Sequence, residues 1–198
     1  MVGATSLAIR FSQKLAVKCV RTALLFAVLL TAFLDGTHAL AESKETIESK
    51  ATKAIAVLIR HAPQSKELLD KAKGVLVFPH IVKMGFGVGA QYGEGVLRVD
   101  GISTGYYSTA GASFGLQLGA QTKSEAILFM SDDALATFQS GQGWEVGVNS
   151  SIAVVKLGKG GKIDSSQWRQ PVLAFIFSNQ GLMGDLSLEG SKITRIAR

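Results

Sequence analysis

The segment from residue 43 to residue 60 places its apolar side chains at helical spacing. These positions are Ile47, Ala51, Ala54, Ile55, Leu58 and Ile59. Because they recur three or four residues apart, they form one face of a predicted amphipathic helix. Pro63 ends this pattern, and residues 64–74 predict a second, shorter helix that stops at Gly74.

After Gly74 the hydrophobic pattern changes to a period of two. Residues 113–121, "SFGLQLGAQ", alternate in the manner of a half-buried strand. Two apolar runs, "EAILFM" at 125–130 and "VLAFIF" at 172–177, are typical of strands that are covered on both faces. Between these runs, Ser131 is a predicted N-cap for a short helix over residues 132–140.

Glycine is concentrated in the predicted strands. All glycines except Gly3 and Gly36 lie between residues 74 and 190. Glycine weakens a strand unless the strand must bend or approach another backbone closely. The sequence therefore predicts a single α+β domain, in which N-terminal amphipathic helices pack on a glycine-rich, strongly curved, mainly antiparallel or barrel-like sheet.

The glycine run at residues 85–95 could be compared with a dinucleotide-binding loop. Such a loop must lead from a strand into a helix, so that a pyrophosphate can bind at the helix N-terminus. Here the run leads instead into "VLRV" and then Asp100–Gly101, a dipeptide that favours a tight hairpin turn. We therefore interpret these glycines as positions of close backbone packing, with no cofactor bound.

Residues 1–41 have the organisation of a secretory signal peptide. Four basic residues precede the apolar run at 22–34, and Ala39 and Ala41 supply the small side chains of a cleavage site. The apolar run is short for a membrane span. We expect cleavage after Ala41, export to the periplasm or the extracellular medium, and a domain over residues 42–198. An uncleaved anchor and an organelle transit peptide remain alternatives.

Removal of this leader changes the chemistry of the chain. The formal net charge falls from +6 to +3, and the single cysteine, Cys19, is lost. A chain without cysteine has no disulfide, thiolate metal ligand or thiol nucleophile. The mild remaining charge does not require a nucleic-acid partner, and none is predicted.

The sequence offers weak candidates for catalysis. Residues 111–115, "GASFG", match the nucleophile-elbow pattern around Ser113, but no histidine follows Ser113 in the chain, as that mechanism requires. Asp132 and Asp133 follow Ser131, where acids stabilise a helix start. His61 and His80 have no acid at ligand spacing, so neither is a predicted metal ligand. We expect no catalytic residue, no metal site and no cofactor.

A basic turn is the remaining candidate for anion binding. Residues 158–162, "GKGGK", lack the serine or threonine of a phosphate-binding P-loop. The backbone of such a turn can still bind an anion, and Lys159 and Lys162 add positive charge.

Several motifs, taken in order, resemble the SYLF domain family. They are "AKGVLVFP" at 72–79, "GAQYGEGVL" at 89–97, "ASFGLQLGAQ" at 112–121, the short helix after "ILFM", and "AFIFSNQGLMGDLSLEGSKI" at 174–193. The resemblance covers about residues 47–196. It implies a non-enzymatic domain that binds phosphoinositide or other anionic membranes, and in some relatives actin filaments. Bacterial relatives of this family are often exported.

The resemblance also implies where a membrane would be bound. Family membrane binding is attributed to an amphipathic segment on the N-terminal side of the domain, which corresponds here to residues 43–60. With the basic turn included, the predicted lipid-binding residues are Lys44, Lys50, Lys53, Arg60, Lys159 and Lys162. Alternatively, the apolar face of this segment simply packs on the sheet.

One departure from the family pattern favours lipid over actin as the partner. "TGYYS" at 104–108 stands where many eukaryotic members carry a Trp-Ser-x-Pro stretch. We therefore expect an anionic lipid surface as the partner. The alternative is a structural or protein-binding, actin-binding-like, envelope module.

Overall fold

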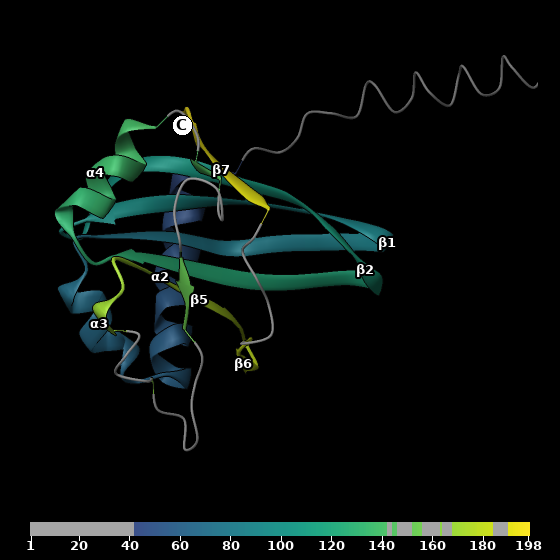
Figure 1. Cartoon of the computed structure of the whole chain (residues 1–198), viewed down its shortest axis with the longest axis horizontal. Coiled ribbons are helices and arrows are strands. Elements are labelled where there is room, and N and C mark those ends of the chain that lie inside the picture. The colour runs from purple at the N-terminus through teal and green to yellow at the C-terminus, as the bar shows by residue number, and fades with distance from the viewer. Residues whose placement is uncertain (1–41, 142–143, 146–151, 156–162, 164–167, 184–189) are drawn as a thin grey trace, which may run out of the picture. The chain divides into compact units, whose positions relative to one another are not determined.

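The computed structural model describes residues 42–141, 144–145, 152–155, 163, 168–183 and 190–198, without the side chains of residues 85–88 and 113–120. The predicted signal peptide, residues 1–41, lies outside this part of the chain, as do Lys159 and Lys162. The described residues form an α+β domain with a strongly curved, mainly antiparallel sheet, as the sequence predicted (Figure 1).

Two helices open the domain. Helix α2 (Lys44–His61) begins where the Ser43 side chain accepts a hydrogen bond from the backbone N–H of Thr46, and Arg60 and His61 occupy its last turn. The Ser43 side chain satisfies a free backbone N–H group at the N-terminal end of the helix. The two basic residues interact favourably with the helix dipole at the C-terminal end. Helix α3 (Ser65–Lys71) follows directly and is bridged by two ion pairs of i, i+4 spacing. Both predicted helices are therefore confirmed.

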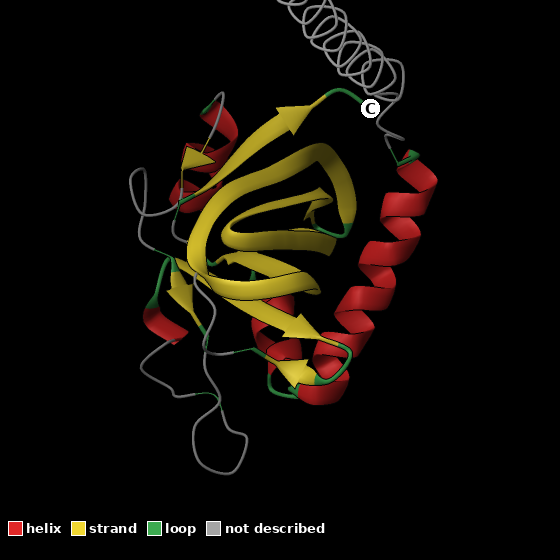
Figure 2. Ribbon diagram, turned by 90° about the vertical axis from the view of Figure 1, so that its right-hand side faces the viewer, coloured by secondary structure: helices red, strands yellow, loops and turns green. Residues whose placement is uncertain are grey.

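A long hairpin of β1 (Gly74–Val99) and β2 (Ile102–Phe129) dominates the sheet. Asp100 and Gly101 form its turn with positive φ angles of 51° and 78°, which a type I′ turn requires. The two ends of β2 pair with different neighbours: residues 106–111 with β7 (Ser191–Ile196), and residues 124–129 with β5 (Val172–Ser178). The sheet thus curls upon itself, and α2 runs along its outer side (Figure 2).

Short strands extend both sides of the sheet. Strand β3 (Trp144–Glu145) pairs with β7, and β6 (Gly181–Leu182) pairs with β5, both in antiparallel register. Strand β4 (Ala153–Val154) runs parallel to β5, which makes the sheet mixed.

Strand β1 also approaches itself, and glycine permits this approach. A Cβ atom at Gly93 would lie 2.7 Å from Cγ1 of Ile81, and one at Gly95 would overlap the Val77 carbonyl oxygen and the Phe78 ring. The two halves of β1 therefore pack closely where residues 93 and 95 lack side chains. For these two positions the packing interpretation of the glycine run is confirmed.

The sheet is buried on both faces near α2 and α4. On one face, α2 and α3 pack against Val77, Leu128, Phe175 and other apolar side chains. On the other face, α4 (Asp132–Ser140) packs with an aromatic group of Tyr107, Phe129, Phe138 and Trp144. Strand β5 is buried on both sides along residues 172–177, as its continuous apolar run predicted.

Candidate functional site

A cleft lies between α2, a bulge of β1 and the turn that joins β5 to β6. It consists of two adjoining hollows of about 470 Å³ and 210 Å³. Both hollows are lined by Pro79, His80, Ser124 and Asn179. Because the two share these residues, we treat them as one feature, which we name the α2–β1 cleft.

The bulge follows from the local sequence. Proline has no N–H to donate to a strand ladder, so it occurs at sheet edges and bulges. The pairing of β1 with β2 shifts register between Phe78 and Ile81, which leaves Pro79 and His80 outside the regular ladder. The Ser124 hydroxyl then donates a 2.7 Å hydrogen bond to the Pro79 carbonyl, which fixes the bulge against β2.

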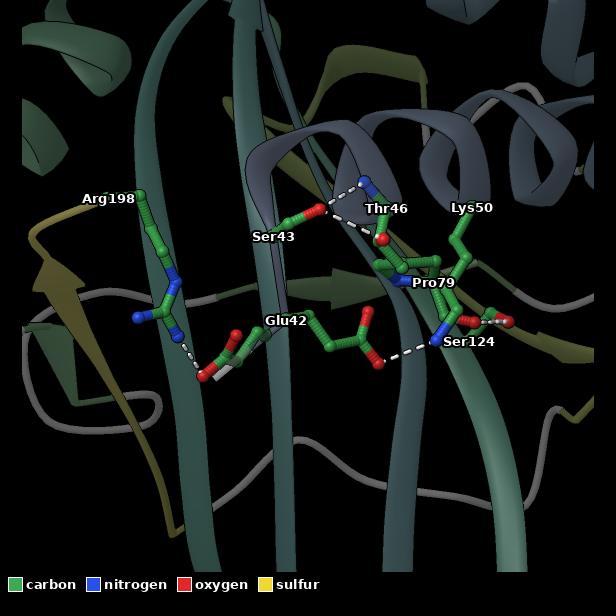
Figure 3. A network of polar contacts seen from close by, with 8 residues as sticks. Glu42, Ser43, Thr46, Lys50, Pro79, Ser124 and Arg198 are labelled. Carbon is green, nitrogen blue, oxygen red and sulfur yellow. Dashed lines mark hydrogen bonds and ion pairs between the residues drawn. The ribbon is translucent and has the colours of Figure 1, made fainter. Parts of the chain in front are cut away.

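Two of the predicted lipid-binding residues line the cleft. Lys50 and Lys53 both line the smaller hollow, together with His80. Lys50 forms a 2.6 Å ion pair with Glu42, and both side chains are partly exposed, so this pair contributes about 0–1 kcal/mol (Figure 3). Lys53 is exposed and makes no ion pair with the described residues.

The other predicted residues lie elsewhere. Lys44 is at the N-terminal end of α2, where its ammonium group lies 5.9 Å from the centre of the Tyr106 ring. Arg60 is exposed in the last turn of α2 and does not line the cleft. Lys159 and Lys162 lie outside the described residues. The structure therefore brings Lys50 and Lys53 together with His80, and leaves Lys44 and Arg60 near the two ends of the helix.

The apolar face of α2 packs on the sheet. Ile47 and Leu58 are fully buried, Ala51 and Ala54 are buried beside them, and Ile55 is partly buried against the same apolar cluster. The alternative interpretation of the amphipathic pattern is thus correct for this conformation, and the polar side of α2 is the side that faces solvent.

A polar clamp fixes α2 to the hairpin. The Glu48 carboxylate receives hydrogen bonds from Arg98, at 2.6 Å, and from the Tyr106 hydroxyl, at 3.0 Å. Burial alone would raise the pKa of Glu48, but hydrogen bonds from Ser103, Arg98 and Tyr106 together outweigh it and lower the pKa. The ionised form of Glu48 therefore holds the helix in place.

The sequence interpretation missed a buried ion pair beside the cleft. Lys123 Nζ lies 2.7 Å from Glu125 Oε1, and these side chains are only 4% and 1% exposed. Lys123 borders the larger hollow. Its side chain and that of Glu125 lie on the sheet face of Ile127, which is opposite the face that α2 covers. Neither oxygen of Glu125 receives a well-aligned hydrogen bond from the described residues. Burial raises the pKa of Glu125, and the Lys123 charge offsets part of that rise.

A sequence signal for this pair exists. Residues two apart on a strand share a face, and "KSE" at 123–125 leads directly into a strand that is buried on both sides. A lysine and a glutamate that share one buried face of a strand predict a buried ion pair. Our interpretation of residues 125–130 as an apolar run passed over Glu125.

The remaining candidates do not assemble into a site. The backbone of Ser113 lies in β2 opposite Gly89, and its side chain is outside what the structure describes. Within the described ranges, no group of three or more histidine, cysteine or acidic side chains is arranged to hold a metal ion. In the same ranges, no helix combines the length and the apolar character needed to cross a membrane.

Comparisons with known proteins point to one family. The family model Ysc84, described as Las17-binding protein actin regulator, matches residues 110–197. The chain is also 27% identical over 161 residues to SH3 domain-containing YSC84-like protein 1 from Bos taurus, Rattus norvegicus and Mus musculus. Each of these alignments covers 73% of this chain and 47% of the relative, so the chain spans about half the length of the curated relatives it matches. The motif order predicted the same relationship, and the match over residues 110–197 together with these relatives supports the SYLF (Ysc84) domain family for this chain.

Proposed function

We propose that this domain binds anionic phospholipid surfaces without catalysis, through the solvent-facing side of α2. The observation that carries the proposal is the arrangement of exposed cations on a helix whose apolar face is already packed. Lys53 and Arg60 are seven residues apart, or about two helical turns, and therefore lie on the same side of α2. Lys50 precedes Lys53 by one turn on the neighbouring side.

This arrangement favours electrostatic contact over insertion of the helix. Each lysine or arginine near an anionic surface contributes on the order of 1 kcal/mol. Ile47 and Leu58 would have to leave the core before they could enter a bilayer, whereas the cations need no rearrangement. Binding should therefore be weak and sensitive to salt, because the Debye length falls from about 10 Å at 0.1 M to about 3 Å at 1 M.

The test is co-sedimentation of residues 42–198 with vesicles of phosphatidylserine and phosphatidylcholine, or of phosphatidylcholine alone. We expect binding to the anionic vesicles at low salt, release at high salt, and little binding to the neutral vesicles. Replacement of Lys44, Lys50 and Lys53 by glutamine should reduce the binding. The matched control replaces Lys66, Lys71 and Lys73, which are exposed cations of α3 and the residues after it, and removes the same charge. Equal loss in both variants, or no binding by the wild type, would contradict the proposal.

A protein-binding function is the second candidate, and the description of the matching family model favours it. The model describes actin regulators that bind another protein, so a protein partner is a reasonable alternative for this chain. In that case the domain would co-sediment with actin filaments or another specific protein and would ignore vesicles of either composition.

We further propose that the chain is exported and that residues 1–41 are removed. The intact mass of the exported protein tests this proposal. A mass that begins at Glu42 supports it, whereas a mass that retains the leader supports an uncleaved anchor.

A further inference from the structure

A second concavity lies beside α3, on the face of the sheet that α2 covers. Its volume is about 340 Å³, and α2, α3, the start of β1 and the turn between β1 and β2 all contribute to its lining. It shares no lining residue with the α2–β1 cleft. We name it the α3–hairpin groove.

The floor of this groove is apolar. Ile55, Leu69, Ala72 and Val75 line it, and each is a partly buried side chain at the edge of the apolar cluster beneath α2 and α3. Single exposed apolar side chains are normal on a protein surface. Four that border one concavity form a pocket into which a further apolar side chain can pack. The described residues therefore leave the cluster partly open at this end.

The rim of the groove is negatively charged. Arg98 lies on the rim, but its charge is compensated by Glu48, which it contacts at 2.6 Å. Asp70 pairs with Lys66 at 2.7 Å, and because these side chains are 62% and 64% exposed, the pair is weak and can exchange for another cation. Asp100 is exposed and makes no ion pair with the described residues. Two carboxylates are thus accessible to a cation from outside.

The carboxylate of Asp100 is not required by the turn that holds it. Asp100 and Gly101 form a type I′ turn with φ angles of 51° and 78°, and asparagine is as well suited to the first position as aspartate. The negative rim also contrasts with the domain as a whole, because residues 42–198 carry 17 basic and 14 acidic side chains. The groove therefore attracts cations locally, whereas the domain as a whole does not.

We propose that the α3–hairpin groove binds a segment of a partner protein that inserts one large apolar side chain and carries lysine or arginine beside it. The apolar side chain would pack on Ile55, Leu69 and Val75, and the cations would contact Asp70 and Asp100. The volume is at the lower end of the range for small-molecule sites, roughly 300 to 1,000 Å³, which suits one side chain with its flanking backbone. An anionic lipid does not suit this rim, because the carboxylates would repel its headgroup.

The first experiment uses three capped tripeptides as probes: acetyl-Lys-Phe-Lys-amide, acetyl-Lys-Ser-Lys-amide and acetyl-Glu-Phe-Glu-amide. Each is titrated into isotope-labelled residues 42–198, and backbone amide shifts are followed by NMR. We expect the Lys-Phe-Lys peptide to shift the amides of Val75 and Gly101 saturably at millimolar concentration. The other two peptides should shift them far less, because one lacks the apolar side chain and the other carries the wrong charge. If all three act alike, or if the first has no effect, the inference is wrong.

The second experiment removes the charges of the rim. Asp100→Asn preserves the turn and should weaken binding of the Lys-Phe-Lys peptide about threefold to fivefold, as expected for a partly exposed ion pair. Addition of Asp70→Asn should weaken binding further. The controls, Glu67→Gln in α3 and Asp133→Asn in α4, remove the same charge from residues that do not line the groove. An equal loss in the controls would mean that general charge attracts the peptide and would overturn the role of the rim.

The third experiment fills the groove. Ala72 is half-buried and lines the groove, so the ring of Ala72→Phe should occupy the pocket and abolish peptide binding. Urea unfolding shows whether this variant is folded. If it is not, Leu69→Ala takes its place, because it removes one side chain of the floor and adds no volume, and it should weaken the binding. Unchanged binding by the folded variant would place the peptide elsewhere and overturn the inference.

The same variants separate this inference from the proposed function. Asp70→Asn/Asp100→Asn should bind anionic vesicles at least as well as the wild type, and the variant with glutamine at Lys44, Lys50 and Lys53 should still bind the Lys-Phe-Lys peptide. Failure of vesicle binding alone leaves the groove inference standing, and failure of peptide binding alone leaves the proposed function standing. If the amides of Val75 and Gly101 shift with the concentration of the domain in the absence of peptide, a second copy occupies the groove and the inferred partner is wrong.

Discussion

Two ion pairs of similar length lie in opposite surroundings in this domain. Arg98 and Glu48 are 2.6 Å apart at the partly exposed contact between α2 and the hairpin. Lys123 and Glu125 are 2.7 Å apart inside the sheet, where both are almost fully buried. Glu48 has further hydrogen-bond donors around it, whereas Glu125 has only Lys123 among the described residues. The pKa of Glu48 is accordingly lowered and that of Glu125 raised.

The difference indicates different roles. A partly exposed carboxylate with several donors stabilises the fold, because ionisation is favoured in the folded state. A buried pair with few partners adds little to stability, and hydrophobic side chains of similar volume often replace such a pair without loss. On this argument, Glu48 and Arg98 stabilise the fold, whereas the pair of Lys123 and Glu125 adds little to its stability.

The largest expected effect comes from breaking the buried pair on one side only. Lys123→Met leaves an unpaired carboxylate in the interior, so the free energy of unfolding should fall by roughly 3 to 5 kcal/mol. Addition of Glu125→Leu should recover most of this loss. Urea unfolding of the two variants and the wild type measures both effects. If the single and the double variant are equally unstable, the two side chains do not act as a pair and the comparison fails.

A smaller loss of stability is expected when the polar clamp between Glu48 and Arg98 is weakened. Glu48→Gln keeps the shape of the side chain but removes the charge that Arg98 contacts, so the free energy of unfolding should fall by about 1 to 2 kcal/mol. Glu45→Gln on the same helix is the control, because Glu45 is exposed and contacts only the helix start. Its unfolding midpoint in urea should move much less. A shift for Glu45→Gln as large as that for Glu48→Gln would mean that general charge on α2, not the clamp, sets the stability.

The sequence predicted the elements that depend on a local residue pattern, namely the helix and the turn that carry the clamp residues. The helical spacing of Ile47, Ala51 and Leu58 identified α2, and Asp100–Gly101 identified the hairpin turn. The approach of Gly95 to Val77 and the hollows around Pro79 depend on how β1 and β2 curl. That curvature arises from contacts between residues far apart in the chain, so neither the cleft nor the clamp between Glu48 and Arg98 could be located from periodicity.

The two acids should also give opposite dependence on pH. The pKa of Glu48 is lowered from 4.5, so its contribution to stability is present above that value and is lost as the pH falls through the lowered pKa. The pKa of Glu125 is raised from 4.5, so the folded state holds its proton more tightly, and stability falls as the pH rises from 4.5 through the raised pKa. Urea unfolding across this range should show a smaller acid-side loss in Glu48→Gln than in the wild type. As the pH rises above 4.5, Lys123→Met/Glu125→Leu should lose less stability than the wild type does. If Glu48→Gln keeps the acid-side loss of the wild type, or the double variant keeps the loss at higher pH, the carboxyl group in question is not the source of that pH dependence.

The smallest expected effect isolates one hydrogen bond of the clamp. Tyr106→Phe removes the hydroxyl that donates to Glu48 Oε1 and leaves the Arg98 contact and the ring in place. The loss of one such bond should lower the free energy of unfolding by about 0.5 to 1.5 kcal/mol, less than Glu48→Gln does. Because that hydrogen bond favours the ionised carboxylate, its removal should also raise the folded-state pKa of Glu48 toward 4.5. The acid-side decline in stability, which starts as the pH falls through 4.5, should therefore be smaller and end at a higher pH. If Tyr106→Phe lowers stability without moving that decline, the hydroxyl acts through packing and not through the Glu48 carboxylate. In the double variant Tyr106→Phe/Glu48→Gln, the two changes should be less than additive, since both remove part of the same contact.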